Sequence, residues 1–74
     1  MRRFRNEKEK ESYLNDMYND SISSEDDAVE QFIYLANKNR GDHTTERHIR
    51  ECYRRAKLGS LLKRLDPIAF NAIQ

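Results

Sequence analysis

The stretch from Thr44 to Leu65, TTERHIRECYRRAKLGSLLKRL, constrains the fold most, because its apolar residues change sides part-way along. At about 100° per residue of an α-helix, two apolar stripes result, and they lie roughly 170° apart. The first comprises Ile49, Cys52, Tyr53 and Ala56, and the second comprises Leu58, Leu61, Leu62 and Leu65. The change of side falls at Gly59. The stretch therefore predicts either a helix that breaks or kinks at Gly59, or one continuous helix with two apolar faces.

Capping residues predict a second long helix in the middle of the chain. Ser24 is suited to cap its first turn, and Asp27 stands three residues on, as in a capping box. Apolar residues then recur at helical spacing around Phe32, which we expect to lie in the core. Gly41 is a suitable residue just beyond the end of this helix.

Weaker signals complete the set of expected elements. An apolar face over residues 13–18 predicts a helix that ends near Asn19 or Asp20, and residues 1–12 form either its solvated start or a frayed charged arm. The third helix is expected to start with a cap at residue 42, 44 or 45 and to run to about Leu58. Asp66 and Pro67 suit the start of a short last helix.

No segment alternates apolar and polar residues as a half-buried strand does. Residues 1–74 are therefore predicted to form a single all-α domain, a small helical bundle of three main helices plus a short C-terminal helix. Because the connections are short, successive helices are expected to be antiparallel neighbours.

The size of the chain limits its core. A domain of 74 residues buries a small fraction of its surface and often needs a partner subunit, a metal or disulfides. Cys52 is the single cysteine, which excludes an intramolecular disulfide and favours a reducing compartment. No apolar run approaches the ~20 residues that span a bilayer, and the basic N-terminus lacks the apolar segment of a signal peptide. We expect a cytoplasmic protein that does not contact membranes.

The leucines of the second stripe predict a dimer. If the second helix covers the first stripe, the second stripe points away from the core, and a monomer rarely tolerates such a patch. A second copy would cover it through a two-fold interface. The expected dimer interface consists of Leu58, Leu61, Leu62, Leu65, Ile68 and Phe70. The alternative is a kink that turns both stripes inward.

Charge is unevenly distributed along the chain. Residues 1–12 carry a net +2, residues 13–37 carry −6 and residues 38–74 carry +5, giving the overall +1. A chain with opposite poles can pair its own halves, dimerise head to tail or offer one pole to a partner.

The basic pole includes a flank of the third helix. Side chains at this spacing suit the phosphates of a nucleic acid or an acidic protein surface, or they are a solvated face partly paired to Glu46 and Glu51. The flank consists of Arg47, Arg50, Arg54, Lys57 and Arg64. A helix-turn-helix with Gly41 in its turn is excluded, because charged residues occupy the positions that pack between its helices.

The acidic pole centres on the start of the second helix. Carboxylates there favour the positive end of the helix dipole, and they also suit a surface that competes with DNA for a basic groove. This acidic block consists of Glu25, Asp26, Asp27 and Glu30.

Catalytic and metal chemistry find little support in the sequence. His43, His48 and Cys52 offer fewer than the four ligands of a structural zinc site, and a Cys52–His48 nucleophile pair lacks any sign of an oxyanion hole. Arg40-Gly41-Asp42 is the integrin-ligand tripeptide, but a helix end explains each residue. We expect no metal, no cofactor and no enzymatic activity.

The profile as a whole resembles the small early proteins by which bacteriophages disable host replication or transcription factors. The shared features are short length, polarised charge, helices only and no catalytic signature. The resemblance implies a non-enzymatic protein-binding module, an inhibitor that occupies a surface of a replication or transcription protein, for example a sliding clamp, in the host cytoplasm. A small nucleic-acid-binding protein that uses the basic flank is the alternative.

Overall fold

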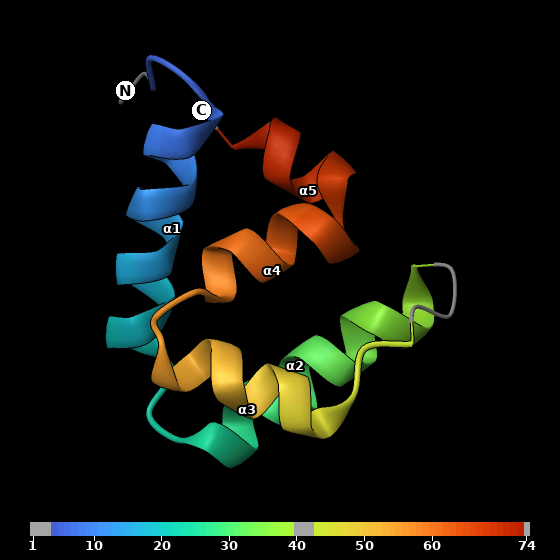
Figure 1. Ribbon diagram of the computed structural model, residues 1–74. Coiled ribbons are helices and arrows are strands. Elements are labelled where there is room, and N and C mark those ends of the chain that lie inside the picture. Colours follow the sequence, from blue (N-terminus) through green and yellow to red (C-terminus); the bar gives the residue numbers. More distant parts are fainter. Residues whose placement is uncertain (1–3, 40–42, 74) are drawn as a thin grey trace.

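The computed structural model describes residues 4–39 and 43–73, and these fold into helices without strands (Figure 1). The helices are α1 (Glu7–Ser21), α2 (Glu25–Lys38), α3 (Glu46–Arg54), α4 (Leu58–Leu65) and α5 (Pro67–Ala72). The predicted all-α bundle is confirmed. Where the sequence left open a break or one continuous helix, the structure has two short helices, α3 and α4.

Helix α4 lies in the middle of the bundle. It packs against α1, α5 and α3, and α2 lies beside α3 (Figure 1). The expectation that successive helices pair is therefore wrong for α1, whose main neighbour is α4 instead of α2. The short connections did not reveal this, because α1 meets α4 through residues far apart in the sequence, such as Asn15 and Ser60.

Side chains cap the helix starts much as the sequence indicates. Ser24 Oγ accepts a hydrogen bond from Asp27 N at 3.2 Å, and Thr45 Oγ1 accepts one from His48 N at 3.1 Å. Asp66 Oδ1 does the same for α5, with Pro67 as its first residue. Each bond satisfies an amide that would otherwise lack a partner in the first turn. Arg40, Gly41 and Asp42 lie outside the described residues.

The charged start of α1 is helical and packed. Ser60 Oγ donates to Glu11 Oε1 at 2.8 Å, and Lys63 Nζ donates to Glu11 Oε2 at 3.1 Å. Lys10 Nζ donates to the carbonyl oxygen of Phe70 at 3.1 Å. These bonds tie the first two turns of α1 to α4 and α5, so residues 7–12 are not a frayed arm.

The core consists of the apolar faces of all the helices. Phe32 is 1% exposed, as predicted, and its ring meets that of Tyr18 edge-on with centroids 5.4 Å apart. The other buried hydrophobic residues are Leu14, Ile22, Ala28, Ala36, Ile49, Leu58, Leu61, Leu62, Leu65 and Phe70.

Most of the residues predicted to form a dimer interface are buried within the single chain. The leucines of α4 and Phe70 are at most 4% exposed within a single chain, so they are core residues that no second copy needs to cover. Of the residues assigned to that interface, Ile68 alone is exposed, at 82%. The alternative of a bend that turns both stripes inward is the observed arrangement.

The bend itself falls at Ala56, before Gly59. Ala56 has φ of 54°, in the left-handed region, and Lys57 N donates to Cys52 O at 2.8 Å. Ala56 N donates to Tyr53 O, which completes the paired bonds of a Schellman helix end. A break at Gly59 was the wrong position, because the residue that adopts the left-handed conformation is an alanine.

Gly59 has a different role inside the first turn of α4. A Cβ atom at this position would lie 2.6 Å from Leu14 Cβ and 2.6 Å from the backbone nitrogen of Asn15. The N–H of Ser60, its neighbour, donates to Asn15 Oδ1 at 3.1 Å. The glycine therefore permits the close approach of α1 and α4.

Candidate functional site

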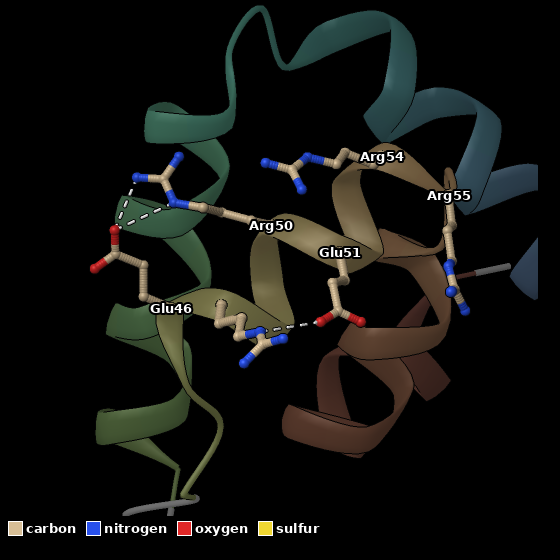
Figure 2. Close-up of a pocket in the computed structure, with 6 residues that line it drawn as sticks. Glu46, Arg50, Glu51, Arg54 and Arg55 are labelled. Carbon is tan, nitrogen blue, oxygen red and sulfur yellow. Dashed lines mark hydrogen bonds and ion pairs between the residues drawn. The ribbon is translucent and has the colours of Figure 1, made fainter.

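The outward side of α3 carries a dense group of charged side chains. Because Ile49 is buried against the core, the residues on the opposite side of the helix face solvent. They line a shallow hollow that runs along the helix (Figure 2). We call this surface the α3 arginine face; it consists of Glu46, Arg47, Arg50, Glu51, Arg54 and Arg55.

Arg50 is the most heavily bonded residue of the face. Its Nη2 donates to Asp26 Oδ1 and to Glu46 Oε1, both at 2.8 Å. Its Nη1 donates to Glu25 Oε2 at 3.2 Å, and its Nε donates to Glu46 Oε1 at 3.2 Å. The hydrogen bonds that Arg50 donates to Glu46, Asp26 and Glu25 raise the pKa of its guanidinium, which stays charged.

Arg54 adds a second link between α3 and α2. Its Nε and Nη2 both donate to the carboxylate of Glu25, the latter at 3.2 Å. Hydrogen bonds from Arg54 and Arg50 hold the pKa of Glu25 below its usual value, so the carboxylate keeps its charge in acid longer than a free one. We call Glu25 and Asp26, in the first turn of α2, the acidic turn.

Arg47 and Arg55 are the outer members of the face. The Arg47 side chain is 91% exposed, and its Nε lies 3.7 Å from Glu51 Oε1 on the same helix. Arg55 is exposed and, within residues 4–39 and 43–73, has no ion-pair partner. In Figure 2, Arg50 and Arg54 point towards α2, and Arg55 extends on the other side of α3.

The structure divides the two charged sets that the sequence indicates. Arg47, Arg50 and Arg54 share the α3 arginine face, but Lys57 lies in the connection to α4 and Arg64 lies on α4 itself. Asp27 and Glu30 line a separate hollow along α2, beside Tyr34 and Leu35. The four residues of the acidic block therefore do not form one surface, because Glu25 and Asp26 face α3.

Sequence reasoning missed Arg55, since it does not continue the three- and four-residue spacing of the flank. It also left open whether the acidic and basic poles pair within the chain or face a partner. The opposite charges of residues 13–37 and 38–74 were the available signal, and pairing of the chain's own halves was one of the arrangements considered. That pairing is what Glu25 and Asp26 make with Arg50 and Arg54.

His48 and Cys52 do approach one another on α3, with Nε2 and Sγ 3.7 Å apart. Burial raises the pKa of the half-buried Cys52 thiol, which disfavours the nucleophilic thiolate. No group of three or more metal-binding side chains occurs within the residues that the structure describes.

A second exposed surface lies where α2 meets the turn between α4 and α5. Tyr34 is 62% exposed, and Lys38 Nζ lies 5.8 Å from the centroid of its ring. The hollow beside it is lined by Lys38, Asn39, Leu65, Asp66, Pro67 and Ile68. Its mixed lining selects no class of ligand.

Comparisons with known proteins add no assignment: a scan against protein-family models, a search of curated proteins and a search of solved structures all gave no match. None of the helices within the described ranges has the length and apolar character needed to cross a membrane. The chemistry of the α3 arginine face is thus the basis for a functional conclusion. Its guanidinium groups are planar donors suited to carboxylates, and they do not act as bases or nucleophiles near neutral pH.

Proposed function

We propose that this chain is a non-enzymatic protein-binding module that engages acidic groups on a partner through the α3 arginine face. The observation that carries the proposal is the interleaving of charges on that face: Arg47 and Arg55 extend to solvent while Glu46 and Glu51 stand between the arginines. Protein surfaces present both signs of charge, so such a pattern favours a complementary protein.

A nucleic acid fits the same surface less well. Its phosphates form a continuous anionic array, and affinity grows with the number of cations that neutralise it. Here Arg50 and Arg54 are already paired with carboxylates, and the exposed carboxylates of Glu46 and Glu51 would repel phosphates. Nucleic-acid binding is therefore the outcome that the experiment must exclude.

The resemblance to small bacteriophage proteins supports a finer version of the proposal. The partner is then a bacterial replication or transcription protein, met in the cytoplasm, and the module inhibits it by occupying its surface. Arg47, Arg50 and Arg54 stand on α3 itself, which supports this mode of action, since side chains on a helix are held more firmly than those on a loop.

The test is affinity capture from a nuclease-treated bacterial lysate with a double variant, Arg47→Glu with Arg55→Glu. Within the described residues neither side chain has a hydrogen bond or ion pair to another helix, so the fold should persist while the face changes sign. We expect the wild type to retain a specific protein and the variant to lose it. Lys8→Glu with Lys38→Glu is the matched control, because it changes net charge equally at exposed positions on α1 and α2.

Two results would contradict the proposal. One is equal retention of the captured protein by the wild type and by the Arg47→Glu, Arg55→Glu variant. The other is capture that disappears with nuclease, accompanied by a DNA gel shift that weakens steeply with salt, since counterion release from phosphates has that signature.

A further inference from the structure

We infer that the acidic turn of α2 is an internal competitor for the α3 arginine face, with Asp26 as its exchangeable arm. This inference rests on the proposed function and adds how the face is regulated. While Asp26 is bound to Arg50, the face offers Arg47 and Arg55 to a partner. A carboxylate of the partner that replaces Asp26 gains Arg50 as a third arginine.

The bonding of Arg50 shows how fully it is occupied. A guanidinium group has five N–H donors. Arg50 makes four hydrogen bonds to carboxylate oxygens, so it has little capacity left for a partner. A partner carboxylate that forms two hydrogen bonds with Arg50 must therefore displace one of the three carboxylates already there.

The exposure of those carboxylates identifies the one that exchanges. The Glu25 side chain is 27% exposed and bonds both Arg50 and Arg54, so displacing it opens two contacts between α2 and α3. The Glu46 side chain is 60% exposed but bonds Arg50 twice from the same helix. The Asp26 side chain is 86% exposed and makes a single bond, at 2.8 Å.

When a partner carboxylate displaces Asp26 from Arg50, α2 and α3 stay packed together. Glu25 still links α2 to both arginines, and the core residues of both helices remain buried. The exchange is then a swap of one exposed carboxylate for another, which nearly balances in water. Asp26 consequently lowers affinity for every acidic partner without preventing binding.

The experiment measures binding of fluorescent poly-L-glutamate, a pure carboxylate probe, at about 50 mM salt, where screening is modest. Asp26→Asn should bind about two- to fivefold more tightly than the wild type, the range expected for one exposed ion pair. Asp16→Asn is the control, because it removes the same charge from an exposed position on α1. Its affinity should change much less.

Equal affinities for Asp26→Asn and Asp16→Asn would overturn the inference, since the effect would then be net charge alone. Absence of binding by Asp26→Asn would also overturn it, because the freed arginine would not be available to carboxylates. The unfolding temperature of Asp26→Asn should lie close to or slightly below that of the wild type, because an exposed ion pair and a charge at a helix start each contribute little. Failure here leaves the capture experiment standing, because that experiment changes Arg47 and Arg55, which have no ion pair with α2 in the described part of the chain.

Discussion

At the scale of single residues, Gly59 has the largest structural effect for its size. The absence of a side chain lets the backbone of α4 approach Leu14 and Asn15 of α1. A glycine within a helix ordinarily costs about 0.5–1 kcal/mol relative to alanine. The contact with α1 compensates for that cost.

Whether Gly59→Ala raises or lowers the free energy of unfolding tests this role. If Gly59 stood in open space, Gly59→Ala would stabilise the protein. We expect it instead to destabilise by about 1–3 kcal/mol, the cost of overpacking, because a Cβ would lie 2.6 Å from atoms of α1. Urea unfolding followed by circular dichroism measures this, and an increase in the free energy of unfolding would be the contrary result.

The structural role of a residue can be predicted from the sequence where one local rule decides it. Ser24, Thr45 and Asp66 cap helices because their side-chain oxygens reach the free amides, and Phe32 is buried because it centres an apolar face. Prediction from the sequence fails at Gly59, where the deciding contact is with a residue 45 positions away along the chain.

At the scale of elements, the joint between α3 and α4 decides the arrangement. The Schellman end at Ala56 turns the chain so that the stripe of Ile49 and the leucines of α4 both reach one core. Periodicity shows that the apolar face changes side, but it does not locate the bend. Glycine is the usual residue for the left-handed position, and Gly59 lies three residues after Ala56. The break was therefore predicted at Gly59.

Relief of backbone strain at this joint is measurable. A left-handed conformation costs an alanine roughly 1–2 kcal/mol, and glycine avoids it at an entropic cost of about 0.5–1 kcal/mol. Ala56→Gly should therefore raise the free energy of unfolding by about 0.5–1 kcal/mol. Ala69→Gly, inside α5, should lower it by about 1 kcal/mol. A loss of stability at both positions would mean that Ala56 does not adopt the left-handed conformation.

At the scale of the whole molecule, α4 is the central element and its leucines are enclosed by a single chain. Leu61→Glu with Leu65→Glu should therefore unfold the protein, because two buried positions would receive charges. Circular dichroism should show loss of helix. Ile68→Glu, at an 82% exposed position, is the control that should remain folded. A folded double variant with native helix content would show that the leucines lie at a surface.

The division of charge in the sequence corresponds to a contact in the fold. Counting charges along the chain reveals two poles, and it allows them to pair internally or to face partners. It does not reveal that Glu25 meets both Arg50 and Arg54, because that depends on α2 and α3 lying side by side. The functional proposals follow from this contact, because it determines which arginines remain available.

A double-mutant cycle on Glu25 and Arg54 tests that contact most directly, since the ion pair of Arg54 in the described chain is with Glu25. Glu25→Gln, Arg54→Gln and the double variant are unfolded thermally at two protein concentrations. We expect the double variant to lose less stability than the sum of the single variants, at both concentrations, as an ion pair within one chain requires. Additive losses, or coupling that appears only at the higher concentration, would contradict it.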